Sequence, residues 1–235
     1  PGILLSSAVE KYANFYGVAC GEKNVLFTNN DSAYETAISL YQKGINVEAI
    51  IDNREETDSK LIKETEKNNI KVYKGYTVED TYGYKRINKV SVMKLSKDGQ
   101  KAIGSKISIS CDCLGISGGW TPAVHLFTQS GGKLKFRDED QVFIPNIYPS
   151  DQISIGSCNG EFTLDEIFST VPKTLKEFLN LKKIDYEDLE IKSSFNKSKR
   201  NIWLLPSEKI IGKTKPFVDY QNDATAKDIK LALRE

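Results

Sequence analysis

The chain has 235 residues, of which 39% are hydrophobic and 28% are charged, a composition typical of a folded globular protein. Its formal net charge of +1 argues against a dedicated nucleic-acid-binding or membrane-binding surface. No stretch approaches the roughly 18 consecutive apolar residues of a membrane span, and the N-terminus does not resemble a signal peptide. Because the chain starts at Pro1 rather than Met, we expect it to be a piece of a longer polypeptide.

The four cysteines predict neither a zinc site nor a disulfide framework. Cys111 and Cys113 lie two apart in a strand-like run, which places both on one face in a poor geometry for a mutual disulfide. Cys20 and Cys158 are isolated in sequence, and the chain holds one histidine. Free thiols are typical of a cytoplasmic protein.

The first elements in the chain predict a βαβ unit. Residues 2–16 have helical spacing, and we interpret residues 1–20 as a connector helix. A short apolar strand, Val25–Phe27, precedes a helical pattern that Gly44 ends, and a second strand, Val47–Ile51, runs into Asp52. This order is half of a doubly wound sheet, the part that usually holds a dinucleotide. The residues expected to share the buried face of the helix are Ala33, Ala37, Ile38 and Tyr41.

The turn after the first strand lacks the usual glycine-rich loop. Asn30, Asp31 and Ser32 stand where the second and third glycines would lie, so side chains and a negative charge occupy the space that a phosphate needs. Asp52 lies about as far along as the acid that holds a ribose hydroxyl, roughly 20 residues past the turn. These four residues are candidate cofactor ligands. The alternative is that Asn30 or Asp31 caps the helix and that Asp52 ends a strand.

The next elements extend the parallel pattern and then interrupt it. A helix is predicted from about Ser59 to Asn69 and a strand at Ile70–Tyr73, which completes a β-α-β-α-β alternation. Residues 87–114 then alternate at period two, and the Asp98–Gly99 pair is a strong hairpin signal. The predicted fold class is α/β, a parallel Rossmann-like sheet with an antiparallel β-meander.

The stretch that follows the meander resembles a known family. The run CDCLGISGGWTPAVHLFTQSGGKL is similar to the α subunit of heterotetrameric sarcosine oxidase, and FTNNDSAYETA, SIGSCNGEFTL and FVDYQNDATAKDIKLA resemble further landmarks in the same order. The resemblance implies NAD on the α subunit, FAD on the β subunit, FMN at the α/β interface and a separate tetrahydrofolate-binding region. It also implies β, γ and δ subunits as partners, and oxidative demethylation of sarcosine to glycine as the activity.

The resemblance also implies a domain organisation. Residues 21–122 would form an inserted NAD(P)-type domain with its meander, and residues 123–172 the C-terminal part of a first dinucleotide-binding domain. Residues 173–216 would be a polar linker. Residues 217–235 would begin a small helical domain that, in related opine and hydroxyproline dehydrogenases, carries a cysteine pair for an iron–sulfur cluster. Asp219 and Gln221 stand in place of those cysteines, so no cluster is expected.

A later loop is the second candidate nucleotide contact. The segment from Ser154 to Gly160 resembles a strand–turn–helix that closes over the ligand with backbone N–H groups. Gly156 and Gly160 permit close approach, and a helix that begins near Thr163 or Leu164 would direct its N-terminus at an anion. The alternative is a turn whose glycines serve only the bend. The candidate ligands here are Gly156, Ser157, Cys158, Asn159, Thr163 and Leu164.

No catalytic or metal-binding residues are predicted for this chain. His125 lies in an apolar run without a nearby carboxylate, so we interpret it as a packed structural residue. The chain alone is expected to be inactive and to contribute NAD binding and the wall of a flavin interface. Two alternatives remain open: a non-catalytic assembly module, and a subunit of an imino-acid or opine dehydrogenase.

Overall fold

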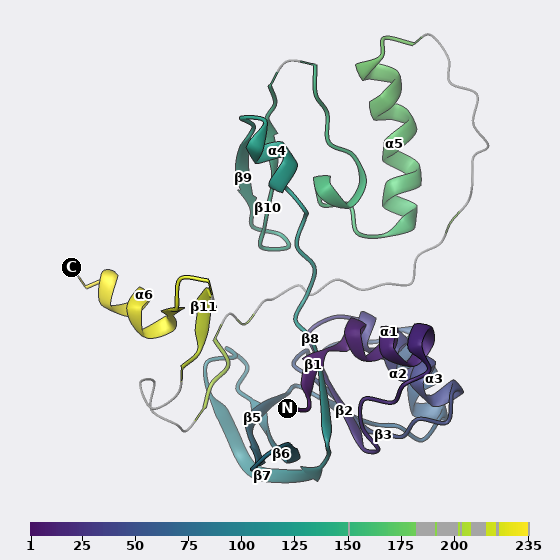
Figure 1. The fold of residues 1–235 in the computed structure, drawn as a ribbon, viewed down its shortest axis with the longest axis vertical. Helices are drawn as coiled ribbons and strands as arrows, with labels where there is room; N and C mark the ends of the chain where they lie inside the picture. Colours follow the sequence, from purple (N-terminus) through teal and green to yellow (C-terminus); the bar gives the residue numbers. More distant parts are fainter. Residues whose placement is uncertain are drawn as a thin grey trace. The chain divides into compact units, whose positions relative to one another are not determined.

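The computed structural model describes residues 1–149, 151–181, 191, 202, 204–207, 215–219 and 221–234 (Figure 1). Contacts between residues divide the chain into two compact units. Unit 1 comprises Pro1–Ser117 and Ile202–Glu235, and unit 2 comprises Gly118–Asn201.

Unit 1 is built on a five-stranded parallel sheet. The predicted βαβ unit is present, with β2 and β3 adjacent, and β8 lies on the other side of β2. Strands β1, β2, β3 and β4 therefore progress across the sheet in one direction, and β8 returns to lie between β1 and β2. In sheet order the strands are β1 (Ile3–Leu5), β8 (Cys113–Ser117), β2 (Asn24–Thr28), β3 (Val47–Asp52) and β4 (Lys71–Lys74).

Both faces of this sheet are buried, as its continuous apolar strands require. Leu26 and Ile50 face a cluster that includes side chains of α1 (Ser6–Tyr16), α2 (Ser32–Gln42) and α3 (Lys60–Lys67). Val25 and Phe27 face the other way, onto the meander. Since successive side chains of a strand point to opposite faces, one apolar run supplies two cores. Figure 1 shows the three helices together on one side of the sheet.

The meander is a three-stranded antiparallel sheet that covers the second face. It consists of β5 (Tyr76–Gly83), β6 (Ile87–Leu95) and β7 (Ala102–Ser110), in that order. The predicted hairpin at Asp98–Gly99 is confirmed, because the Gly99 N–H donates to the Ser96 carbonyl (2.7 Å) and the Ser96 N–H donates to the Lys101 carbonyl (2.9 Å). Val90 and Val92 carry the packing against the parallel sheet.

Three details of unit 1 differ from prediction. The expected first helix begins at Ser6, since residues 3–5 pair with β8 as an edge strand and this pairing overrides their helical spacing. In α2, Tyr41 is 47% exposed, and Tyr34 and Leu40 take the buried positions beside Ala33 and Ala37. Strand β5 was not predicted. Polar residues interrupt its apolar alternation.

Unit 2 contains α4 (His125–Gln129), β9 (Lys133–Arg137), β10 (Val142–Ile147), the 3₁₀ helix η1 (Gly156–Asn159) and α5 (Leu164–Phe178). Strands β9 and β10 form an antiparallel hairpin. The strand expected before Gly156 is absent from residues 151–155, where an irregular segment leads into η1. Helix α5 occupies the first residues of the expected linker, 173–178. The rest of that linker lies largely outside the described residues. The prediction for His125 was wrong: it begins α4 and is exposed.

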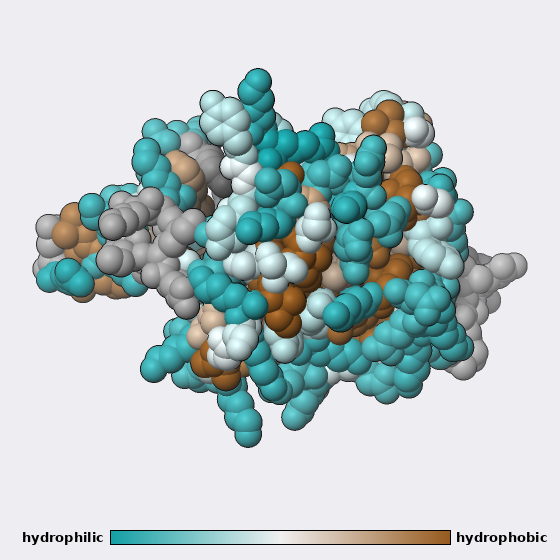
Figure 2. All heavy atoms as spheres, turned by 90° about the horizontal axis from the view of Figure 1, so that it is seen from below, coloured by the Kyte–Doolittle hydropathy of each residue, from teal (hydrophilic) through white to brown (hydrophobic). Residues whose placement is uncertain are grey.

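The end of the chain forms a short hairpin and a helix. β11 (Phe217–Asp219) pairs with β12 (Ala224–Thr225), and α6 (Ala226–Ala232) follows, in agreement with the helix predicted there. Leu205 packs against the core that the meander shares with the sheet. On the face seen in Figure 2, hydrophobic side chains lie in patches between hydrophilic ones. Among the described residues, no helix is long and apolar enough to cross a membrane.

Candidate nucleotide-facing loops

The carboxyl ends of three parallel strands bring the first group of predicted residues together. Thr28, at the end of β2, lies in register with Asp52 of β3 and Ser117 of β8. The turn from β2 into α2 rises at this edge and contains Asn30, Asp31 and Ser32. In open α/β sheets, this edge beside the central strand is where ligands usually bind.

Side chains fill the turn itself. Asn30 is 2% exposed, and its Oδ1 accepts hydrogen bonds from the Ser32 backbone N–H (2.9 Å) and Ser32 Oγ (2.6 Å). Its Nδ2 donates to Asn29 Oδ1 (2.8 Å) and Ser117 Oγ (3.2 Å), and Ser32 Oγ lies 2.7 Å from Ser117 Oγ. The amide of Asn30 thus joins two strand ends and the first turn of α2. Its Oδ1 accepts the hydrogen bond of the Ser32 backbone N–H, which would otherwise be available to a phosphate.

A buried ion-pair network lies beside that turn. Arg54 Nη2 lies 2.8 Å from Asp31 Oδ1 and 2.7 Å from Asp52 Oδ2. The side chains of both aspartates are fully buried, and that of Arg54 is 11% exposed. Tyr34 OH donates to Asp52 Oδ2 (2.8 Å), and Arg54 Nε and its backbone N–H donate to Asp52 Oδ1 (3.0 and 2.9 Å). Burial and the adjacent Asp52 carboxylate raise the pKa of Tyr34, which keeps the phenol protonated as a donor.

This arrangement does not fit a dinucleotide. Both carboxylate oxygens of Asp52 already accept hydrogen bonds and are shielded from solvent, so a ribose hydroxyl has no access to them. Asp31 stands at the N-cap position without a side-chain capping bond, and Asn30 satisfies the Ser32 N–H instead. Of the two residues predicted to cap this helix, Asn30 is therefore the one whose side chain does so. Sequence reasoning missed the bridging cation, Arg54, although its place two residues after an acidic strand end was a usable signal.

The second group of predicted residues lies in unit 2, on the loop that leads into α5. Gly156 has φ +70°, and a Cβ added there would meet nothing within 4 Å. Gly160 has φ +82°, and its Cβ would lie 2.8 Å from Arg137 Nη2 and 2.9 Å from Ile144 Cγ2. Gly156 thus leaves space where a Cβ would lie, although its backbone N–H donates to Glu161 Oε2 (3.0 Å), whereas Gly160 permits close packing against the β9–β10 hairpin. Ser157, Cys158 and Asn159 form the short 3₁₀ turn between the two glycines.

The N-terminus of α5 is already capped. Thr163 is the N-cap, in a capping box with Glu166, whose Oε2 accepts from the backbone N–H groups of Phe162 (3.0 Å) and Thr163 (3.2 Å). Asp165 and Glu166 place negative charge in the first turn, where it interacts favourably with the helix dipole. The predicted start at Thr163 or Leu164 is confirmed, but the acids disfavour a phosphate there. Leu164 is 60% exposed.

Three of the four cysteines have a raised thiol pKa. Burial is the main cause that raises the pKa of Cys111 to about 11 and that of Cys113 to about 12, so both remain thiols at neutral pH. Burial also raises the pKa of Cys20, against the lowering effect of Arg86. Cys158 donates from Sγ to the Ile155 carbonyl (3.0 Å). All four cysteines are free, and no metal-binding cluster occurs among the described residues.

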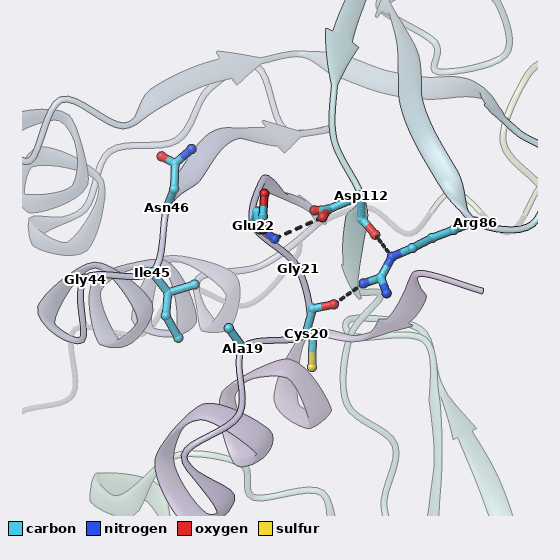
Figure 3. Close-up of a pocket in the computed structure, with 9 residues that line it drawn as sticks. All are labelled: Ala19, Cys20, Gly21, Glu22, Gly44, Ile45, Asn46, Arg86 and Asp112. Carbon is cyan, nitrogen blue, oxygen red and sulfur yellow. Dashed lines mark hydrogen bonds between the residues drawn. The ribbon is translucent and has the colours of Figure 1, made fainter.

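A cavity of about 560 Å³ lies at the opposite, amino-terminal edge of the parallel sheet (Figure 3). The loops before β2, β3 and β8 line it. Arg86 crosses between them, with Nε donating to the Asp112 carbonyl (2.9 Å) and Nη2 donating to the Cys20 carbonyl. The Asp112 carboxylate accepts from the N–H groups of Glu22 (3.0 Å) and Lys23 (2.8 Å). These charged groups therefore hold the loops together, and the cavity has no acid–base pair.

The chain is similar along nearly its whole length to α subunits of sarcosine oxidase, which confirms the resemblance inferred from sequence. It is 31% identical over 240 residues to the subunit of Corynebacterium sp. (strain P-1), covering 97% of this chain and 24% of that protein. It is 29% identical over 246 residues to the subunit of Rhizobium meliloti (strain 1021), covering 100% of this chain and 22% of that protein. The chain thus spans about a quarter of the length of these relatives. No protein-family profile matches it.

Two solved structures are similar to parts of the chain. Thioredoxin reductase of T. acidophilum superposes with a TM-score of 0.46 at 19% identity, over 68% of this chain and 54% of that one. The disulfide reductase RclA of Escherichia coli gives a TM-score of 0.48 at 14% identity, over 76% of this chain and 39% of that one.

Proposed function

We propose that this chain is an internal segment of the α subunit of a sarcosine oxidase, a flavin-dependent amine oxidoreductase. The observation that carries the proposal is that the similarity to known α subunits runs through both units and covers 97–100% of the chain. A shared parallel-sheet domain alone would leave unit 2 unmatched. The parallel sheet of unit 1, covered by helices and a meander, is compatible with an inserted dinucleotide-type domain.

We propose different roles for the two units. Unit 1 is a scaffold that shapes the subunit, because its turn at Asn30 and its acid Asp52 are engaged in a closed internal network. Unit 2 contributes the nucleotide contact, because a Cβ added at Gly156 would meet nothing within 4 Å, which leaves space beside this turn. Since the capped N-terminus of α5 disfavours a phosphate and Glu161 accepts the Gly156 N–H, the contact runs through the space beside Gly156 and the 3₁₀ turn of Ser157, Cys158 and Asn159. NAD would complete its site with segments outside this chain.

The chemistry of the proposed enzyme resides in its flavins. FAD on a β subunit and FMN at the α/β interface would pass two electrons from sarcosine to oxygen. The methyl group would leave as formaldehyde or, in a separate region, as methylene-tetrahydrofolate, with glycine as the other product. The described residues of this chain offer no activated nucleophile, so we propose no catalytic residue within it. Its role is to bind, to position and to join subunits, with β, γ and δ chains as partners in the cytoplasm.

The experiment is to purify the full-length α subunit with its partner subunits and to measure bound NAD, bound flavin and sarcosine-dependent formaldehyde formation. We expect one NAD per α subunit and loss of most of it in Gly156→Val, whose side chain would enter the open space. The matched control is Ser32→Val, which alters the closed turn and should leave NAD content unchanged. A complex without NAD would contradict the nucleotide role.

A non-catalytic assembly module is the second candidate function. The observation that favours it is the closed network around Asp52, because unit 1 has the fold of a dinucleotide domain without an accessible ribose acid. If the purified complex oxidised sarcosine but held no NAD, we would conclude that both units serve as assembly modules.

A further inference from the structure

Helix α5 presents an apolar face that the described chain covers only in part, with Ile167, Val171 and Leu175 half-buried. Its hydrophobic residues recur at helical spacing along one side, and we call this set the α5 stripe. None of the fifteen residues of α5 is buried. Phe168 and Phe178 are each 45% exposed, and Leu164 is 60% exposed. The stripe consists of Leu164, Ile167, Phe168, Val171, Leu175 and Phe178.

The rest of unit 2 supplies too little core to hold this helix. Among its described residues, Phe127, Val142 and Ile144 are the buried hydrophobic side chains. Isolated helices of about 15 residues are marginal in water, and Pro172 removes one internal hydrogen bond from this helix. An amphipathic helix of this kind is stable when its apolar side packs on another surface. The exposed part of the α5 stripe therefore offers a surface for further packing.

We infer that the α5 stripe docks on an apolar surface of the same polypeptide, formed by a segment outside these 235 residues. This inference rests on the proposed function, in which the chain is part of a longer α subunit. The relatives support it, since the match covers 22–24% of their length and leaves about three quarters of each protein to supply such a segment. A unit with so small a core needs its partner at high effective concentration, which linkage in one chain provides.

Charge and hydrogen bonding specify the chemistry of the docking surface. Near the N-terminus of α5, Asp165 Oδ1 is buried and has no hydrogen-bond partner among the described residues, in a turn that also contains Glu166. A buried acceptor without a donor is costly. The covering segment should therefore present an apolar surface along the stripe and a hydrogen-bond donor, such as a lysine, an arginine or a backbone N–H, beside Asp165.

Hydrogen exchange of the α5 amides tests this inference. We expect exchange at least a hundredfold slower in the full-length α subunit, purified without other subunits, than in the 235-residue chain. Equally fast exchange in both proteins would overturn the inference. Protection that arises only after other subunits are added would also overturn it. So would concentration-dependent protection of the 235-residue chain, which would identify a second copy as the partner.

A pair of charge-matched variants of the full-length subunit sharpens the test. Phe168→Asp places a charge on the stripe and should speed α5 exchange at least tenfold, whereas Ser169→Asp, on the exposed side, should change it less than twofold. Equal effects would contradict the inference. If Phe168→Asp does not accumulate, the comparison of the two wild-type proteins still decides. Loss of sarcosine oxidation with α5 still protected would refute the proposed function and leave this inference intact.

Discussion

Two turns that lead from an extended or irregular segment into a helix differ in how they use the space near the helix start. The turn at Asn30–Ser32 is closed, with an amide, two hydroxyl groups and an Asp–Arg–Asp network satisfying one another. The loop at Gly156–Gly160 is open on one side, since a Cβ at Gly156 would meet nothing.

The comparison of the two turns shows which of them leaves space for a ligand in a dinucleotide-type fold. Buried charges need partners, so a turn that holds Asp31 also needs Arg54, and together they remove the site. The glycine turn contains no such buried ion pair, and the space where a Gly156 Cβ would lie stays unfilled although Glu161 accepts the Gly156 N–H. Perturbing each turn should therefore have different consequences, stability for the first and ligand content for the second.

The largest expected effect is on the closed turn. Arg54→Met leaves Asp31 and Asp52 as buried carboxylates without their cation, which should lower the free energy of unfolding by about 3–5 kcal/mol. Urea denaturation of the chain, followed by circular dichroism, measures it. The control Lys63→Met removes an exposed pair with Asp58 and should cost less than about 0.5 kcal/mol. If Arg54→Met lowered the free energy of unfolding by less than about 1 kcal/mol, the network would not be important for the stability of the fold.

Alanine substitutions at the two glycines of the open loop should distinguish the cost of backbone strain from the cost of steric crowding. Gly156→Ala introduces only a residue at positive φ, at about 1 kcal/mol. Gly160→Ala adds contacts with Arg137 and Ile144 and should cost about 2–3 kcal/mol. Hydrogen exchange of the loop amides in the full-length subunit reports both. Equal effects would mean that space around the two glycines is alike.

A single hydrogen bond of the closed network should have a smaller effect. Tyr34→Phe removes the donor to Asp52 while Arg54 still neutralises that carboxylate, so we expect a loss of about 1.5 kcal/mol by urea denaturation. Tyr41→Phe, at a 47% exposed position of the same helix, is the control and should be neutral. If the two variants were equally stable, the phenol would contribute nothing to the network.

The smallest perturbation is chemical labelling of the thiols, which compares core and loop directly. Cys111 and Cys113 are 1% and 0% exposed, and burial raises their pKa to about 11 and about 12, so both are protonated and shielded at pH 8 and should be alkylated only when the chain unfolds. Cys158, half-buried in the open loop, should react first, and bound NAD in the full-length complex should slow it. Iodoacetamide labelling with peptide mass spectrometry gives both rates. Faster labelling of Cys113 than of Cys158 would contradict this order.

Much of unit 1 followed from sequence because its signals are local. The apolar run at Val25–Phe27, the helical spacing that follows it and the Asp98–Gly99 turn each depend on a few neighbouring residues, and each element is present. The short edge strand at residues 3–5 did not follow, because only pairing with β8 distinguishes it from a helix start. Exposure of Tyr41 was equally inaccessible, since it depends on which neighbours pack against α2.

The sequence by itself determined the α/β class, the missing glycine loop and the resemblance to sarcosine oxidase α subunits. Composition, periodicity and residue identity are properties of the chain alone. Only the tertiary structure shows that the Asp52 carboxylate is inaccessible to a ligand. The parallel register of β2 and β3 brings Asp31, Tyr34 and Arg54, which lie apart in the sequence, next to one another. The space beside Gly156 and the partial exposure of the α5 stripe also follow only from the tertiary structure. Both depend on which atoms lie nearby in space, and sequence spacing does not contain that information.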